Sequence, residues 1–245
     1  MTRAEQAVTE SEQKVAIVTG GSQGIGAGLV DAYRQRGWAV VANSLHVKPS
    51  KDPDVLTVAG DVSEQATADR IMSQALDRFG RVDTLVNNAG VFVSKAFTDY
   101  TAEDYALVTG VNLAGFFWLT QRAIGQMLKQ RGGHVVNISA SIAAHADSVE
   151  PTALTALTKG GLAAVTKSLA VEYASHGIRV NAVAPGIIQT PVHPAESYAP
   201  EALAGKLPPL GRVGQVSDVV DGILYLESAP YVTGEILYID GGRTA

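Results

Sequence analysis

The chain has 245 residues, with 46% hydrophobic residues, 18% charged residues and a formal net charge of -5. These values are typical of one globular domain, and they exclude a disordered or fibrous chain. The negative charge argues against non-specific nucleic-acid binding, and the absence of cysteine excludes disulfides, thiolate metal sites and cysteine nucleophiles. We predict no metal site and no nucleic-acid partner.

Residues 1–13 are polar and lack the apolar core of a signal peptide. No stretch of the chain is apolar over the roughly 20 residues that a membrane-spanning helix requires. We therefore expect a disordered tail over residues 1–13 and a single domain over residues 14–245. We also expect a cytoplasmic location and no membrane partner.

From Lys14 onward, short β-branched runs alternate with longer helical patterns, which is typical of βαβ units and a parallel sheet. The predicted strands lie at 14–20, 38–44, 56–62, 82–90 with its exit turn, 133–139, 178–186 and 235–242. The predicted helices lie at 26–37, 67–80, 102–129 and 152–175. The pattern indicates an α/β, Rossmann-like, doubly wound fold.

Helices 102–129 and 152–175 are apolar on more than one face, so they need partners on both sides. Small residues in the second of them would allow close approach of another helix: Gly160, Gly161, Ala163, Ala164 and Ala170. This pattern indicates either oligomerisation or burial between the sheet and a neighbouring helix of the same chain.

Residues 190–210 form the one long irregular stretch and contain five prolines. Loops after strand carboxyl ends form the ligand crevice of an open α/β sheet, so this stretch is a candidate cover for the substrate. It contains Val192, His193, Tyr198 and Leu203, which favour a moderately apolar ligand.

A glycine-rich turn directly follows the first predicted strand and opens the first predicted helix. Gly20, Gly24 and Gly26 allow a tight turn, close backbone approach to a pyrophosphate, and anion binding at the helix N-terminus. A purely structural turn is the alternative, but the strand–turn–helix context favours a dinucleotide site.

At these residues the sequence resembles the short-chain dehydrogenase/reductase family. The family's T-G-x-x-x-G-x-G motif stands at Thr19 to Gly26, and its N-N-A-G motif at Asn87 to Gly90. Further motif positions are Asp61-Val62, Asn112 and Pro185-Gly186, and residues 231–242 match the closing strand. The resemblance covers residues 14 to 242.

The resemblance implies a seven-stranded parallel sheet with helices on both faces and an NAD(P) molecule across the strand ends. It implies a pyrophosphate site at Gly20, Ser22, Ile25 and Gly26, adenine contacts from Asp61 and Val62, ribose contacts from Asn88 and Gly90, and carboxamide contacts from Ile188 and Thr190. We also assign to the cofactor site the motif positions Gln23, Gly24, Ala89, Lys159, Pro185 and Gly186. Asp61 has a plain alternative role as a turn former. A homotetramer, or a homodimer, is the assembly that the family implies.

The end of the second strand bears on the choice of cofactor. An acidic residue there would bind the ribose 2′-hydroxyl of NAD and repel a 2′-phosphate. Ser44 occupies this position, with His46 and Lys48 close behind and no carboxylate before Asp52. We therefore favour NADP(H) over NAD(H), although Gln23 stands where NADP-preferring members often carry a basic residue.

The family's reaction moves a hydride between the nicotinamide and a carbonyl or alcohol carbon, while a Tyr moves the proton on oxygen. A Lys four residues later lowers the pKa of that phenol, a Ser orients the substrate and an Asn holds a water. Lys159 and Asn112 are present, but Thr155 occupies the Tyr position, and an aliphatic hydroxyl does not titrate. For the Ser we prefer Ser141 to Ser139. The predicted catalytic residues are thus Asn112, Ser141, Thr155 and Lys159.

Two groups could replace the missing phenol: His145, in the stretch before the helix, or a water on Thr155 polarised by Lys159. We predict an NAD(P)-dependent oxidoreductase, of the carbonyl reductase or alcohol dehydrogenase type, with such a non-standard proton donor. The alternatives are a non-redox enzyme (a cyclase, isomerase or lyase) and a catalytically silent nucleotide-binding protein.

Overall fold

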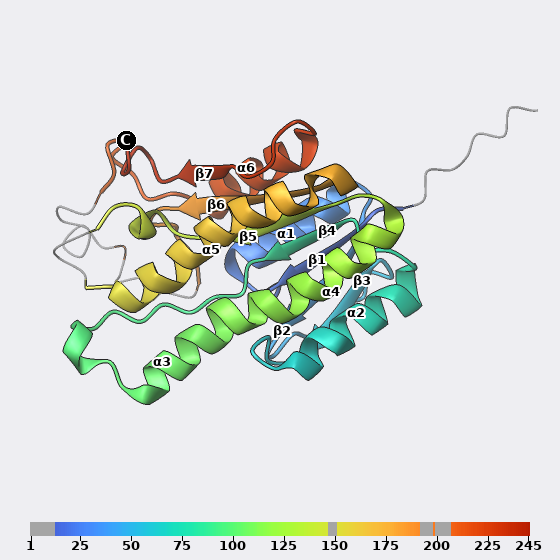
Figure 1. Cartoon of the computed structure of the whole chain (residues 1–245), viewed down its shortest axis with the longest axis horizontal. Coiled ribbons are helices and arrows are strands. Elements are labelled where there is room, and N and C mark those ends of the chain that lie inside the picture. Colours follow the sequence, from blue (N-terminus) through green and yellow to red (C-terminus); the bar gives the residue numbers. More distant parts are fainter. Residues whose placement is uncertain (1–12, 147–150, 192–197, 199–206) are drawn as a thin grey trace, which may run out of the picture.

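The computed structural model describes residues 13–146, 151–191, 198 and 207–245. The predicted tail over residues 1–13 lies outside this part except for Gln13, as do Val192, His193 and Leu203 of the predicted substrate cover. In the described part, helices pack on both sides of one seven-stranded sheet (Figure 1).

The strands are all parallel, and their spatial order is β3-β2-β1-β4-β5-β6-β7. They are β1 (Val15–Thr19), β2 (Ala39–Ser44), β3 (Val55–Ala59), β4 (Thr84–Asn87), β5 (Gly133–Ile138), β6 (Ile178–Pro185) and β7 (Ile236–Ile239). The predicted seven-stranded parallel sheet is confirmed. Chain order reverses between β1 and β4, which creates a crevice at the carboxyl ends of these two strands.

The strands are connected mainly by α-helices. These are α1 (Gly24–Gln35), α2 (Gln65–Phe79), α3 (Ala102–Thr109), α4 (Gly115–Gln130), α5 (Ala153–Tyr173) and α6 (Val216–Ser228). The short helical turns are η1 (Phe97–Asp99), η2 (Gly110–Ala114), η3 (Ser141–Ala143) and η4 (Ala174–His176).

Alternation along each strand divides the core into two layers, because successive side chains of a strand point to opposite faces. Val15 and Ile17 of β1 pack in the layer shared with α2, α4 and α5, whereas Ala16 and Val18 pack in the layer shared with α1 and α6. The sheet is therefore buried on both faces (Figure 1).

The predicted continuous helix over residues 102–129 is wrong in one respect: a π-helical turn, η2, interrupts it. Asn112 lies in this turn and is 1% exposed. Its amide donates to the carbonyl oxygen of Val91 at 3.1 Å, and its Oδ1 accepts from the Val91 amide at 2.9 Å. These contacts with a distant loop favour a local change of helix pitch that no periodicity in the sequence reveals.

The third strand is shorter than predicted, because it ends at Ala59 instead of continuing to Val62. Asp61 and Val62 therefore lie in the turn after the strand. Within the described ranges, no helix is both long enough and apolar enough to cross a membrane.

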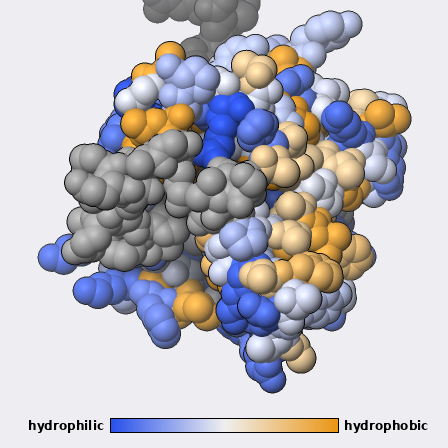
Figure 2. Space-filling model, turned by 90° about the vertical axis from the view of Figure 1, so that its left-hand side faces the viewer, coloured by the Kyte–Doolittle hydropathy of each residue, from blue (hydrophilic) through white to orange (hydrophobic). Residues whose placement is uncertain are grey.

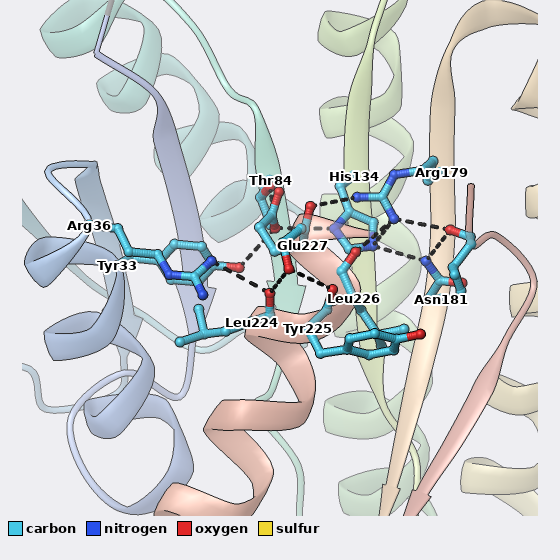
Figure 3. Close-up of polar contacts among 12 residues, drawn as sticks. Tyr33, Arg36, Thr84, His134, Arg179, Asn181, Leu224, Tyr225, Leu226 and Glu227 are labelled. Carbon is cyan, nitrogen blue, oxygen red and sulfur yellow. Dashed lines mark hydrogen bonds and ion pairs between the residues drawn. The ribbon is translucent and has the colours of Figure 1, made fainter. Parts of the chain in front are cut away.

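A buried polar cluster lies at the amino ends of β4, β5 and β6 (Figure 3). At its centre is the carboxylate of Glu227 from α6. This carboxylate accepts hydrogen bonds from the Thr84 hydroxyl at 2.9 Å and from the Tyr33 hydroxyl at 3.1 Å, and it lies 3.1 Å from Nδ1 of His134. Burial opposes ionisation of Glu227, but these contacts outweigh it and hold the pKa of the carboxyl below its usual value.

The neighbours of His134 decide its tautomer. The Asn181 Nδ2 donates to the carbonyl oxygen of Val232, and its Oδ1 accepts from the amide of Glu235, so the Nδ2 must be the group 3.1 Å from Nε2 of His134. The guanidinium of Arg179 lies 3.4 Å from the same nitrogen. Nε2 is thus an acceptor. A second ring proton would have to sit on Nε2, where it would point at two donor groups, so the charged imidazolium is disfavoured. Burial accordingly lowers the pKa of His134 below its ordinary 6.5.

We expect the protein to lose stability as the pH falls from 7 toward 5. The unfolded chain takes up the His134 proton near pH 6.5, whereas the folded chain resists it, so the free energy of unfolding decreases by up to about 1.4 kcal/mol per pH unit. Glu227 causes a further loss of stability at lower pH. Because its pKa is lowered in the folded chain, its contribution to the free energy of unfolding is present above the usual carboxyl pKa and is lost as the pH falls below that value. Urea unfolding at several pH values, with His134→Gln as the comparison, measures this slope. A slope unchanged in His134→Gln would contradict the assignment.

Candidate active site

The site predicted from the sequence lies where the carboxyl ends of β1, β4, β5 and β6 meet. Parallel pairing places these ends on one edge of the sheet, and the segments that follow them carry the predicted residues. Figure 2 looks toward this edge and shows hydrophobic side chains gathered beside hydrophilic ones. Exposed aromatic side chains of the segment after β4 include Phe92 and Phe97.

The glycine turn between β1 and α1 forms a tight cradle. Gly20 and Gly24 adopt φ values of 66° and 55°, which side-chain-bearing residues rarely reach. A Cβ atom at position 26 would overlap the carbonyl oxygen of Gly20. The first turn of α1 contains no acidic residue, and Gln23 at its N-cap makes no side-chain hydrogen bond to it. The amides at this N-terminus are thus available to an anion, and the cradle fits a pyrophosphate.

Asn88 and Thr19 hold this cradle in place. The Asn88 side chain donates to the carbonyl oxygens of Thr19 at 2.8 Å and Gly20 at 3.3 Å. The Thr19 hydroxyl accepts from the amides of Asn88 and Ala89, both at 3.0 Å. Sequence reasoning left Thr19 out of the site, although its place at the start of the glycine motif could have indicated it.

The turn after β3 brings Asp61 and Val62 to the same edge. The Asp61 carboxylate accepts from the amide of Ser63 at 2.8 Å, so this residue does serve as a turn former, which was the plain alternative. Both residues are half-buried and remain partly accessible. A Cβ atom at Gly115 would lie 2.9 Å from the Val62 side chain, which shows how closely this turn packs against α4.

Two hydroxyls meet where β2 ends beside the glycine turn. The Oγ atoms of Ser22 and Ser44 are 2.9 Å apart. Asp52, the first carboxylate after β2, is bonded to the guanidinium of Arg34 at 2.8 Å. His46 and Lys48 are exposed on the loop that follows Ser44.

The segment after β6 reaches back over the glycine turn. Pro185 ends β6, and a Cβ at Gly186 would come within 2.8 Å of the backbone of Asp240. A Cβ at Gly24 would lie 3.5 Å from the Thr190 side chain. The hydroxyl of Tyr198 donates to the carbonyl oxygen of Ile188 at 3.1 Å and accepts from the Thr190 amide at 3.0 Å.

Lys159 of α5 places a buried cation at the centre of this edge. It is 8% exposed, and its Nζ donates to the carbonyl oxygen of Ile138 at 2.7 Å. Burial lowers the pKa of Lys159 from its ordinary 10.5 to about 8. A Cβ atom at Gly90 would lie 3.0 Å from Nζ and 3.4 Å from Oδ1 of Asn112, so only glycine lets the chain pass here without moving the ammonium.

The serines after β5 differ in their surroundings. The Ser139 hydroxyl donates to the carbonyl oxygen of Lys159 at 2.8 Å, which commits it to fixing α5 against β5. Ser141 opens η3 and is 3% exposed. The geometry therefore gives Ser139 a structural role and is consistent with the preference for Ser141.

Thr155 lies one helical turn before Lys159 and is 2% exposed. Its Oγ1 has no hydrogen-bond partner among the described residues. His145 lies beyond η3 and is exposed, with its backbone amide bonded to the carbonyl oxygen of Ser141 at 3.0 Å. The structure thus brings Asn112, Ser141, Thr155 and Lys159 to one edge and leaves His145 on the surface.

A model of the family described as Enoyl-(Acyl carrier protein) reductase matches residues 20–244. The chain belongs to the short-chain dehydrogenase/reductase family. It is 35% identical to the 3-oxoacyl-(acyl-carrier-protein) reductase of Thermotoga maritima over 247 residues, which cover 94% of this chain and 98% of that protein. This is a family of NAD(P)-dependent oxidoreductases.

Two solved structures are similar to this one over nearly the whole chain. The 3-ketoacyl-(acyl-carrier-protein) reductase of Brucella melitensis, complexed with NADH, has a TM-score of 0.86 and 30% identity, covering 96% of this chain and 99% of that one. ElxO with NADP bound has a TM-score of 0.86 and 29% identity, covering 94% and 98%. The resemblance seen in the sequence motifs is confirmed at the level of the family.

Proposed function

We propose that this protein is an NADPH-dependent reductase of carbonyl compounds, or a dehydrogenase of the matching alcohols, that works without the family's tyrosine. The main support is the buried ammonium of Lys159, held beside Gly90 and Asn112 at the same edge as the glycine cradle. A carbonyl oxygen gains negative charge as its carbon accepts a hydride, and a fixed positive charge in a water-poor site stabilises that change.

The cofactor would supply the hydride, and the residues of this chain would hold it. Gly20, Ser22, Ile25 and Gly26 would bind the pyrophosphate at the N-terminus of α1, with Gln23 and Gly24 completing the turn. Lys159, Asn88, Ala89 and Gly90 would line the ribose, and Asp61 and Val62 the adenine. The segment with Pro185, Gly186, Ile188 and Thr190 would cover the nicotinamide end. Asn112 would fix the loop around Gly90 through its two bonds to Val91.

NADPH is favoured over NADH by the chemistry at the end of β2. Ser22 and Ser44 offer two neighbouring hydroxyls, and the first carboxylate beyond them, Asp52, is neutralised by Arg34. Hydroxyls accommodate a 2′-phosphate, whereas a carboxylate in place of Ser44 would repel it. His46 and Lys48 are exposed close behind and add positive charge to the loop.

The substrate is expected to be a small, moderately apolar carbonyl compound. Exposed Phe92 and Phe97 lie in the segment that follows β4, and the face seen in Figure 2 is partly hydrophobic. The relatives from Thermotoga maritima and Brucella melitensis bear names of reductases of 3-oxoacyl groups, which are apolar chains carrying a ketone. A ketone of this class is the first substrate to test.

A second candidate function is favoured by Thr155 itself. In place of the family's tyrosine this residue offers no titratable proton, so the fold could serve a non-redox cyclase, isomerase or lyase, or a catalytically silent nucleotide-binding protein. A product formed without cofactor oxidation would identify the non-redox enzyme. Tight cofactor binding with no product would identify the catalytically silent binding protein.

We also propose that the protein forms a homotetramer, or a homodimer, through α4 and α5. Phe117, Leu157 and Val171 on these helices are 51%, 62% and 82% exposed. An apolar groove runs between the two helices and is lined by Leu113, Phe116, Phe117, Trp118, Leu162 and Val165. A Cβ at Gly161 meets no atom closer than 3.9 Å, so the small residues leave room for a second copy.

Purified protein should consume NADPH with at least one compound from a panel of ketones, quinones and β-ketoacyl thioesters, and Thr155→Tyr should be no faster, because the proton comes from another group. Absorbance at the NADPH band, with product analysis, measures both. An inert natural protein beside an active Thr155→Tyr would contradict the proposal and direct attention to non-redox or binding roles.

We expect NADPH to bind more tightly than NADH, and Ser44→Asp to reverse this order by placing a negative charge against the 2′-phosphate. Titration of nucleotide fluorescence measures both affinities, and Ser44→Ala serves as the control that removes the hydroxyl without adding charge. Tighter binding of NADH to the natural protein would overturn the assignment.

Light scattering after size exclusion should give the mass of a tetramer or dimer, and Leu157→Lys together with Phe117→Lys should shift it toward the monomer, because two charges would be buried at the contact. A monomeric natural protein would remove the proposed interface.

A further inference from the structure

The hydroxyl of Thr155 stands apart from those of the other buried threonines of α5. The Thr158 hydroxyl donates to backbone carbonyls of its own helix and accepts from Asn112 at 3.1 Å. The Thr166 hydroxyl likewise donates to its helix and accepts from Asn137 at 2.9 Å. The hydroxyl of Thr155 is equally buried, yet it has no partner in the part of the chain that the structure describes.

A buried hydroxyl without a partner is energetically unfavourable, so native proteins rarely leave one unless water or a ligand occupies the place beside it. The carbonyl one turn earlier, that of Pro151, already accepts from the Ser94 hydroxyl at 3.0 Å. A water molecule bound at such a hydroxyl needs two or more polar partners.

Lys159 supplies the second partner. Residues four apart on a helix lie on the same face, with Cβ atoms about 5–6 Å apart, so one water can reach both side chains. The ammonium has three N–H donors, and the structure records one acceptor for them, the carbonyl oxygen of Ile138. Gly90 and Asn112 lie close to Nζ on another side, since a Cβ atom at Gly90 would come within 3.0 Å of it.

Building on the function proposed above, we propose that Lys159 is the proton source of the reaction and that Thr155 is a positioning residue, holding the water that carries the proton to the substrate oxygen. In this arrangement the lysine does directly what the family assigns to a tyrosine. The pKa of about 8 for Lys159 suits the task, since the ammonium can lose a proton near neutral pH.

In a reduction, every proton and electron has a defined source. The carbonyl carbon accepts a hydride from a reduced nicotinamide nucleotide, and the electron pair of the C=O π bond moves to oxygen. That oxygen takes a proton from the water, the water takes one from the ammonium of Lys159, and the neutral amine regains its proton from solvent. The products are an alcohol and the oxidised nucleotide.

His145 is the competing donor, and its position disfavours it. It is exposed beyond η3, whereas the ammonium of Lys159 is buried at the edge that carries the glycine cradle. A proton from His145 would need a path from the surface to this edge, whereas Thr155 and Lys159 already lie on one helix face.

The first test needs no turnover. The protein is labelled with ¹³C-lysine, loaded with NADP⁺, and the Lys159 side-chain resonance is assigned by its loss in Lys159→Met and followed over pH. We expect titration near pH 8. In Thr155→Val, which removes the hydroxyl at almost constant volume, the water that solvates the ammonium is lost and the pKa falls by about one unit. Thr155→Ser, which keeps the hydroxyl, should titrate like the natural protein.

The second test follows hydride transfer in a single turnover with a ketone that the natural protein reduces. The rate should fall as the pH rises through the value at which Lys159 titrates, because the acid form is the donor. Thr155→Val should lower the rate about a hundredfold, in line with loss of general acid catalysis, with unchanged NADPH binding. Thr155→Ser should restore it, and His145→Gln should leave both the rate and its pH profile as they are.

The outcomes separate this role from the proposed function. Reduction by the natural protein with a Lys159 titration unaffected by Thr155→Val, or a rate that collapses in His145→Gln, would overturn the proton role and leave the reductase function standing. No NADPH oxidation with any compound of the panel would overturn the reductase function, and the proton role with it.

Discussion

Burial of one parallel sheet on both of its faces is the constraint on which the rest of the structure depends. Every strand between two helical layers must present apolar side chains alternately to each, as Val15 and Ala16 of β1 do. Polar side chains therefore gather toward the two edges of the sheet at which the strands begin and end. At the amino edge it forms the cluster around Glu227, and at the carboxyl edge it forms the candidate active site.

The two edges use buried polar groups for different purposes. At the amino edge every polar group found around His134 has a partner, and the network ties α1 and α6 to three strands. At the carboxyl edge the side-chain amides of Asn88 and Asn112 form hydrogen bonds with backbone groups, and these bonds fix the loops around the crevice. Three kinds of group at this edge have no hydrogen-bond partner recorded among the described residues and are available to a ligand: the amides at the start of α1, donors of Lys159 and the hydroxyl of Thr155.

This division indicates how cofactor positioning and proton donation can be separated within the short-chain dehydrogenase/reductase family. Cofactor positioning is proposed to depend on the glycine cradle, the Asn88 and Asn112 contacts and the lysine. Proton donation is proposed to depend on the same lysine together with the side chain one turn before it. Replacing that side chain leaves the electrostatics of the site intact, because the buried ammonium provides the charge.

The sequence by itself determined the fold and indicated the place of the candidate site. The strand patterns and the family motifs predicted seven parallel strands, and the glycine turn indicated the cradle, because these depend on residues that are neighbours in the chain. The roles of Thr19 and Ser139, the π turn at Asn112 and the cluster around Glu227 were decided only by the tertiary structure. Each of them depends on hydrogen bonds between residues that lie far apart in the sequence and meet only when the sheet is assembled, as Asn112 meets Val91 and Glu227 meets His134. The unpartnered hydroxyl of Thr155 belongs to the same class, since a missing partner can be recognised only when all the neighbours are known.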